Sequence, residues 1–149
     1  MYLFLCVFII SCIFFGDYKI KKYVEEKVDG PKPILGGHIL VRRYHNRGAI
    51  LNLGQRRSKI VTAVSLLLCL FLSAVFLLSL GQRGNHLLRI GLSFLLGGAF
   101  SNTYDRLKRK YVVDYFSFQV KWKPLGRIVY NLSDFCILIG ALLSVLGSS

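Results

Sequence analysis

Acidic residues are scarce in this sequence. Among its 149 residues, 7 Asp and Glu stand against 20 Lys and Arg, which gives a formal net charge of +13. The charged residues occur in blocks, and residues 60–80 contain no charged side chain at all. A soluble domain of this length would interleave charged and apolar residues at the period of a helix or a strand. The pattern therefore excludes an ordinary cytosolic enzyme and a basic nucleic-acid-binding domain.

Several signatures of enzyme chemistry are also absent. The three histidines do not form an H-E-x-x-H arrangement, which argues against zinc hydrolysis. There is no G-x-S-x-G nucleophile motif and no glycine-rich phosphate loop. The four cysteines lie inside apolar stretches without metal-ligand spacing, so we interpret them as small buried hydrophobic residues. A Ser/Lys dyad stays open, although no lysine lies inside an apolar stretch, and we expect neither a metal nor another cofactor.

Long apolar stretches are what the sequence has instead. Four occur, at residues 2–16, 60–80, 87–104 and 128–147. About 20 apolar residues are enough for a helix to cross the hydrocarbon core of a bilayer. No Lys or Arg precedes the first stretch, so the n-region of a signal peptide is missing and we interpret the stretch as a retained helix. We predict one domain over residues 1–149, a mainly α membrane protein with four transmembrane helices.

The third stretch ends in small residues. Gly97, Gly98 and Ala99 follow one another there. Small side chains let a neighbouring membrane helix approach closely. We therefore expect this helix to pack tightly against another one.

The segment after the first apolar stretch predicts a helix followed by a surface loop. Residues 17–28 are rich in Lys and Glu and extend the first helix. The Gly-Pro-Lys-Pro run at residues 30–33 ends it. A surface loop with a β-ribbon follows, over about residues 30–57.

Two short strands are expected in this loop. Residues 39–44 and 49–53 have strand composition and are joined by a turn at residues 45–48. Because two strands alone are marginally stable, the ribbon either packs on the membrane surface or gains a third strand. The candidate third strand is residues 111–120, which are rich in Val, Tyr and Phe. The expected product is a small antiparallel sheet.

Three of the few acids stand in unusual places. Asp134 lies about seven residues into an uncharged stretch, where a carboxylate costs roughly 3 kcal/mol to insert. It is a functional candidate, and the alternative is an acid at a helix end that pairs with Lys or Arg. Asp114 is flanked by apolar residues, and its alternative is a solvent-facing acid on a half-buried strand. For Asp105, which precedes Arg106, an ion pair or a helix cap is favoured over catalysis.

Spacing adds to this reading of the acids. Asn131 and Asp134 are three residues apart, as are Asn102 and Asp105, so each pair shares one helix face. Asp114 lies between the two pairs in the sequence. Two carboxylates brought close together share a proton. Such a pair can activate a water as general base and protonate a leaving amine, which is peptide hydrolysis without a metal or a covalent intermediate.

Five segments, in order along most of the chain, resemble the motifs of lipoprotein signal peptidase, the bacterial signal peptidase II family of four-span membrane aspartyl proteases. Residues 17–21 resemble D-x-x-x-K, 45–49 resemble N-x-G-A, 97–106 resemble G-G-A-x-G-N-x-x-D-R, 113–115 resemble V-x-D-F and 130–134 resemble F-N-x-A-D. Each motif is modest alone. Their shared order and spacing, together with four apolar stretches, make the resemblance fairly specific.

The resemblance implies that Asp114 and Asp134 form the catalytic dyad of an aspartic endopeptidase. It also implies two further groups of residues. Those that position the substrate would be Asn46, Asn102, Arg106 and Asn131. Those that support the site would be Asp105, Asp17, Lys21 and Gly48. The implied reaction removes the signal peptide of a diacylglyceryl-modified prolipoprotein by cleavage immediately before the lipidated Cys. The other expected partners are membrane lipid and cyclic peptide inhibitors such as globomycin. We do not expect the protein to bind nucleic acid, and we expect it to be a monomer.

The implied topology conflicts with the distribution of positive charge. Residues 17–58 carry ten Lys and Arg and residues 102–128 carry seven. The positive-inside rule would place these two loops in the cytoplasm and both termini outside. The resemblance instead implies a bacterial cytoplasmic membrane protein with both termini in the cytoplasm and the sheet and active site on the extracytoplasmic side. We follow the resemblance, because the aspartate pattern is more specific than a count of Lys and Arg.

Four residues depart from the family pattern. Ser101 stands where the family usually has Gly, Ser133 where it has Ala, and Tyr115 and Tyr130 where it has Phe. All four changes are small, and the two Tyr changes mainly add a hydroxyl. They indicate a divergent member, with altered substrate preference.

Two other classes of function stay open. One is a non-catalytic homologue that binds lipidated proteins or anionic lipid through basic loops. Residues 106–110 suit headgroup binding, at about 1 kcal/mol per cation near an anionic surface, and equally suit a solvated juxtamembrane signal. The other is a small transporter or channel, which a single buried acid and the lack of broken-helix symmetry make weak.

Overall fold

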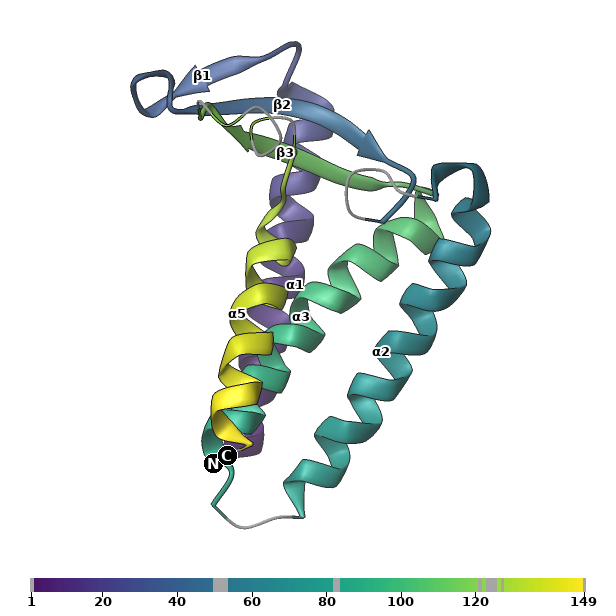
Figure 1. Cartoon of the computed structure of the whole chain (residues 1–149), viewed down its shortest axis with the longest axis vertical. Helices are drawn as coiled ribbons and strands as arrows, with labels where there is room; N and C mark the ends of the chain where they lie inside the picture. Colours follow the sequence, from purple (N-terminus) through teal and green to yellow (C-terminus); the bar gives the residue numbers. More distant parts are fainter. Residues whose placement is uncertain are drawn as a thin grey trace.

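The computed structural model describes residues 2–49, 54–81, 84–120, 122, 126 and 128–148. This part of the chain is mainly helical with a small antiparallel sheet, as predicted (Figure 1). The elements, in chain order, are α1 (Tyr2–Lys27), β1 (Lys32–Ile34), a 3-10 turn (Leu35–Gly37), β2 (Ile39–Asn46), a second 3-10 turn (Gln55–Arg57), α2 (Ser58–Leu80), α3 (His86–Lys108), β3 (Val112–Phe118) and α5 (Leu132–Gly147).

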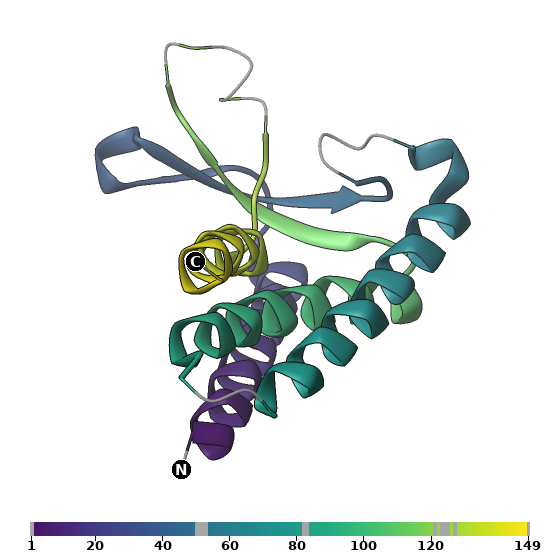
Figure 2. The same ribbon diagram turned by 60° about the horizontal axis from the view of Figure 1, so that its bottom comes forward.

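Helix α3 is the centre of the helical layer. It contacts α1, α2 and α5, and the sheet lies across one end of the helices while both termini lie at the other (Figures 1 and 2). Small residues allow the close contacts, as expected. A Cβ atom added at Gly97 would lie 2.8 Å from the Ile13 side chain in α1, and one added at Gly98 would lie 2.6 Å from the Ser133 carbonyl oxygen in α5.

The outer helices expose their apolar side chains. Residues Tyr2–Lys27 and Gln55–Leu80 are long and apolar enough to cross a membrane, and Leu132–Gly147 is a shorter apolar helix. Phe4 and Leu78 are 79% and 75% exposed. A water-soluble protein would bury such helices in its core, because large exposed apolar surfaces mark contacts with lipid or protein. These helices are therefore membrane-associated.

The sheet has the strand order β1-β2-β3 and is antiparallel throughout. The expected third strand at residues 111–120 is confirmed as β3. The partner proposed for residues 39–44 is different, because β2 pairs with Lys32–Ile34. Most of the strand predicted at 49–53 lies outside the described residues.

The turn predicted at residues 45–48 is also wrong in part. Strand β2 continues through His45 and Asn46, and β1 reverses into β2 at Gly36 and Gly37, which have φ values of 65° and 90°. Glycine adopts positive φ without the steric cost that a side chain brings. This glycine pair is therefore the turn signal that composition alone did not single out.

Helix α5 begins four residues after the start of its apolar stretch. Asn131 is its N-cap, and its Oδ1 accepts the Asp134 N–H at 3.0 Å while Asp134 Oδ2 accepts the Asn131 N–H at 2.9 Å. This reciprocal pair is a capping box, which satisfies two backbone donors at a helix start. The expectation that Asp134 lies well inside the helix is wrong, since it lies in the first turn.

The extension of α1 beyond its apolar stretch carries the sheet. Val24 and Val28 at the end of this extension pack against Val113 and Tyr115 of β3, and all four side chains are buried. The contact fixes β3 over the ends of the helices. Of the cysteines, three are buried as predicted, whereas Cys12 is exposed.

Candidate active site

Two acids meet amide side chains where β3 and α5 come together below the sheet. Asp114 on β3 is buried, and its Oδ1 and Oδ2 accept hydrogen bonds from Asn131 Nδ2 at 2.7 Å and from Asn46 Nδ2 at 3.0 Å. Asp134 Oδ1 accepts a bond from Asn102 Nδ2 at 3.1 Å. Asn131 therefore contacts both acids, one through its side-chain amide and the other through its backbone N–H.

A hydrogen-bonded turn holds Asn46 in place. Asn46 Oδ1 accepts the Gly48 N–H at 3.0 Å, and Asn46 Nδ2 also donates to the Ala49 carbonyl at 3.0 Å. Arg106 braces this turn from α3, because its guanidinium donates to the Gly48 carbonyl at 3.0 Å and to the Asn102 carbonyl at 3.2 Å. The Asn46 amide is thus directed at Asp114 by groups from β2, the following turn and α3.

The surroundings of Asp114 keep it partly protonated near neutral pH. Burial and the neighbouring Asp134 carboxylate together raise its pKa to about 7, although the amides of Asn46 and Asn131 and the Lys21 ammonium act in the opposite direction. Desolvation and a like charge both disfavour the ionised form of a carboxyl. This is the electrostatic arrangement expected of two acids that share a proton.

An ion network is buried directly behind the two acids. The Lys21 ammonium lies 2.7 Å from Asp17 Oδ2 and 3.1 Å from Asp105 Oδ2, and the Lys21 and Asp17 side chains are fully buried. Lys21 also donates to Asn102 Oδ1 at 2.8 Å. Buried charges are tolerated when they are paired and hydrogen-bonded in this way. Lys21 therefore connects the ion network with the amide that contacts Asp134.

Asp105 serves the ion network and the sheet. Besides Lys21, it accepts the backbone N–H of Val113 at 3.3 Å and pairs with Arg109 at 3.5 Å. These contacts tie β3 to the end of α3 one residue before Asp114. The structure thus joins all ten predicted site residues in one continuous set of contacts, namely Asp17, Lys21, Asn46, Gly48, Asn102, Asp105, Arg106, Asp114, Asn131 and Asp134.

Three further residues belong to this set and were not predicted as part of it. The hydroxyls of Ser101, Tyr115 and Ser133 all donate to Asp17. The sequence singled them out only as departures from the family pattern. Their one other signal is position, because each is the chain neighbour of a predicted site residue.

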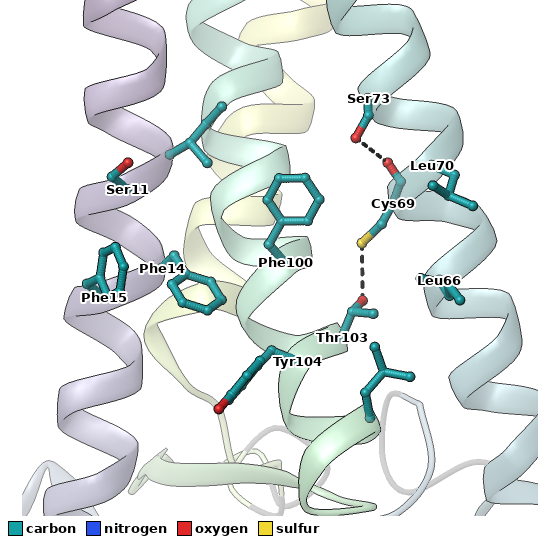
Figure 3. A pocket seen from close by; sticks show the side chains of 12 residues that line it. Ser11, Phe14, Phe15, Leu66, Cys69, Leu70, Ser73, Phe100, Thr103 and Tyr104 are labelled. Carbon is teal, nitrogen blue, oxygen red and sulfur yellow. Dashed lines mark hydrogen bonds between the residues drawn. The ribbon is translucent and has the colours of Figure 1, made fainter.

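An apolar groove among the described residues is separate from the acids. It has a volume of about 380 Å³ and lies between α1, α2 and α3 (Figure 3). Phe14, Phe100 and Tyr104 line it, and a bond between Cys69 Sγ and Thr103 Oγ1 at 3.1 Å joins α2 to α3 there. The lining includes none of the ten predicted site residues. Within the described residues, no group of His, Cys, Asp and Glu is placed to hold a metal ion.

A family model described as signal peptidase (SPase) II matches residues 9–148. The chain belongs to the signal peptidase II family. Among relatives, this family member is 32% identical over 136 residues to the lipoprotein signal peptidase of Caldicellulosiruptor bescii, a match that covers 91% of this chain and 84% of the relative. It is 34% identical over 115 residues to that of Clostridium acetobutylicum, covering 74% of this chain and 70% of the relative.

Solved structures agree on the fold. Two bacterial membrane enzymes determined by the in meso method, at 2.3 Å and 1.9 Å resolution, match with TM-scores of 0.80 and 0.77. Each match covers 97% of this chain, and 87% and 92% of the other chains, at 16% and 15% identity. This signal peptidase II family member is therefore a membrane-associated protein with the fold of bacterial membrane enzymes, and its family is one of proteases.

Proposed function

We propose that this chain is an aspartyl endopeptidase that removes the signal peptide from diacylglyceryl-modified prolipoproteins by cleaving immediately before the lipidated Cys. The observation that carries the proposal is the joint attachment of Asp114 and Asp134 to Asn131. The two acids come from a strand and a helix, 20 residues apart in the sequence, and one residue contacts both. Family membership supports the substrate class.

In the proposed mechanism, Asp114 and Asp134 share one proton and hold a water between them. The acid that is ionised takes a proton from the water, which attacks the carbonyl carbon before the lipidated Cys. The other acid then gives its proton to the leaving amine. The raised pKa of Asp114 supports this division, because it leaves Asp114 partly protonated near neutral pH.

The amides and Arg106 would position the substrate backbone around this pair. Asn46, Asn102 and Asn131 donate to the two acids, so their amides lie directly beside the place where the scissile bond would be held. Arg106 keeps the Gly48 turn against α3. Asp17, Lys21 and Asp105 have a supporting role in this proposal, since they lie behind Asn102 and β3.

We further propose that the single domain crosses a bacterial cytoplasmic membrane four times, through α1, α2, α3 and α5. Both termini would then face the cytoplasm and the sheet would lie on the extracytoplasmic surface. Helix α5 has 16 residues, about 24 Å, which is less than the roughly 30 Å of the hydrocarbon core. Its first turn, which carries Asp134, therefore fits a scissile bond held near the membrane surface.

Interaction partners follow from the same proposal. Membrane lipid would surround the exposed apolar faces of the outer helices. Cyclic peptide inhibitors such as globomycin would occupy the acid pair in competition with substrate. We propose a monomer, because one chain supplies all the residues of the site.

A role limited to lipid binding has less support. It depended on free cations in residues 106–110. Arg106 instead donates to two backbone carbonyls, Arg109 pairs with buried Asp105, and the Lys110 ammonium donates to the Leu107 carbonyl. Arg106 and Arg109 are therefore held by contacts within the fold, whereas Lys108 and Lys110 stay exposed and could still contribute to headgroup binding.

The proposal is tested by cleavage of a diacylglyceryl-modified prolipoprotein in detergent. Wild type should convert the precursor, and Asp114→Asn and Asp134→Asn should each lower the rate by about 10²-fold to 10⁴-fold, because a general acid or base is lost. Asp29→Asn is the matched control, since this acid is 94% exposed and its ion pair is with Arg43. Cleavage at the wild-type rate by Asp134→Asn would contradict the proposed dyad.

A further inference from the structure

One buried carboxylate accepts hydrogen bonds from hydroxyl groups of three other elements. Asp17 in α1 accepts hydrogen bonds from Ser101 of α3 at 2.7 Å, from Ser133 of α5 at 2.5 Å and from Tyr115 of β3 at 3.0 Å. It also forms the 2.7 Å ion pair with Lys21. The Asp17 side chain is fully buried, so these four groups replace the water that a carboxylate would otherwise bind.

Each of the three hydroxyls belongs to the chain neighbour of a proposed site residue. Ser101 precedes Asn102, Tyr115 follows Asp114 and Ser133 precedes Asp134. On β3 successive side chains point to opposite faces, so Asp114 faces the amides while Tyr115 faces Asp17. Asp17 is thus bonded to the chain immediately beside three groups of the site.

Tyr115 makes a second contact that links the two acids more directly. Its hydroxyl oxygen accepts the Leu132 N–H, the first of helix α5, at 2.8 Å. Asp114 lies one residue before Tyr115, and Asp134 lies two residues after Leu132. The phenol therefore sets the separation between the strand and the helix that carry the two acids.

The hydroxyls act behind the site. Ser101, Tyr115 and Ser133 are 2%, 6% and 0% exposed, and their oxygens point to Asp17. These are three of the four positions at which the chain departs from the family pattern of Gly, Phe and Ala, none of which carries a hydroxyl. The three departures therefore share one acceptor, although they lie in three separate motifs.

We propose that Ser101, Tyr115 and Ser133 form a hydroxyl clamp on Asp17 that fixes the relative positions of Asn102, Asp114 and Asp134. They are positioning residues and do not touch the substrate. This inference rests on the proposed function, whose catalytic geometry the clamp would hold. Because the clamp acts on the geometry of the acid pair, its loss lowers kcat and leaves KM nearly unchanged.

The test compares Ser101→Ala, Tyr115→Phe, Ser133→Ala and the triple variant in the prolipoprotein cleavage assay. Each single change should lower kcat about three- to tenfold, as expected for one hydrogen bond, with KM within about twofold of wild type. Tyr115→Phe should have the largest effect, because it also frees the Leu132 N–H. The triple variant should lose less than the product of the three single losses, because the groups share one acceptor.

Two variants serve as matched controls. Tyr130→Phe restores the Phe of the family pattern at the fourth position. Among the described residues, four groups are bonded to Asp17, and the Tyr130 hydroxyl is not one of them. Ser93→Ala removes a buried hydroxyl of α3 that donates to the Arg89 carbonyl at 2.7 Å. Both should keep the wild-type kcat. Equal losses in the controls, or variants of the clamp that change KM alone, would overturn the proposal.

Melting temperatures in detergent separate this inference from the proposed function. A wild-type protein that cleaves no lipidated precursor contradicts the proposed function. The clamp is then judged by the melting temperatures of the single and triple variants. Losses smaller than the sum of the single effects support a shared acceptor, and losses that add independently overturn it.

Discussion

The two sides of helix α3 differ in what holds them to their neighbours. Toward α5 and the sheet, Ser101, Asn102 and Asp105 join a dense polar network that extends over α1, β2, β3 and α5. Toward α2, the contact is an apolar groove crossed by the bond between Cys69 and Thr103 (Figure 3). Helix α3 buries eleven of its 23 residues and α2 only three of 23.

This difference separates the part of the molecule that positions the acids from the part that faces lipid. A buried polar network has few alternative arrangements, because each group that loses its partner remains desolvated. Apolar contact with α2 can be replaced by contact with lipid at little cost, since lipid tails are as apolar as the helix. Substitutions on the two sides of α3 should therefore differ in size and in kind.

The largest effect is expected for Lys21→Met. The change leaves the buried carboxylates of Asp17 and Asp105 without their shared ammonium. Breaking a buried ion pair from one side costs about 3–5 kcal/mol, so the variant should melt far below wild type or fail to fold. Thermal unfolding in detergent measures this, with Lys22→Met as the control because Lys22 is 59% exposed. An unchanged melting temperature would show that the buried ion network of Lys21 is not what mainly stabilises the site.

Gly98→Ala should have the next largest effect, and it should include a loss of activity. The added Cβ would lie 2.6 Å from the Ser133 carbonyl oxygen, so α5 must shift next to Asp134. Overpacking of this kind costs about 1–3 kcal/mol, and a small displacement of a reacting group can cost up to about 10²-fold in rate.

The matched control for Gly98→Ala is Gly16→Ala in α1, where nothing lies within 4 Å of the added Cβ. There the free energy of unfolding should stay equal or rise, because alanine favours a helix more than glycine does. Cleavage kinetics and melting curves of the two variants check both statements. Similar behaviour of the two would show that the α3–α5 contact is not the tight one.

A smaller effect is expected from pH, through Asp114. Its pKa is about 7 in the folded protein, against about 4 in an unfolded chain. The folded state therefore binds more protons between these values, and the free energy of unfolding falls as pH rises from about 4 to about 7. Asp114→Asn should weaken this slope and be more stable than wild type by about 1–2 kcal/mol at about pH 8.

Melting temperatures measured across that pH range test the Asp114 prediction. Asp29→Asn should keep the wild-type slope, because Asp29 is 94% exposed. A slope that Asp114→Asn leaves unchanged would mean that another group titrates in this window.

The smallest effect is expected on the α2 side, for Thr103→Val. The change removes the bond to Cys69 but keeps the shape of the side chain. Hydrogen bonds between membrane helices contribute about 0.6 kcal/mol on average, so the melting temperature should change little and kcat should stay within about twofold. Cleavage kinetics and a melting curve suffice as the measurement. A loss of kcat as large as that of Gly98→Ala would show that the two sides of α3 are not independent.

Patterns of neighbouring residues accounted for most of the elements. Helices at residues 58–80 and 86–108 follow from apolar stretches, because a helix satisfies its backbone hydrogen bonds within one segment. The position of Asp134 in its helix was predicted wrongly, although the sequence contains a signal for it. Asn131 followed three residues later by an acid is a capping signal, and it places the helix start at Leu132.

Contacts between distant segments were less accessible. Strand β1 has three residues and includes Pro33, so its composition did not identify it as the partner of β2. Pairing depends on which segments the turn at Gly36 and Gly37 brings together. Strand preference by itself does not contain that information.

By itself, the sequence determined the apolar helices, the acids and amides available for chemistry, and the family. Only the tertiary structure decided that the hydroxyls of Ser101, Tyr115 and Ser133 meet at Asp17, across sequence separations of 84, 98 and 116 residues. The reason is physical. A residue's type sets which bonds it can form, whereas the packing of helices and strands sets which distant partner is within 3 Å when water is excluded.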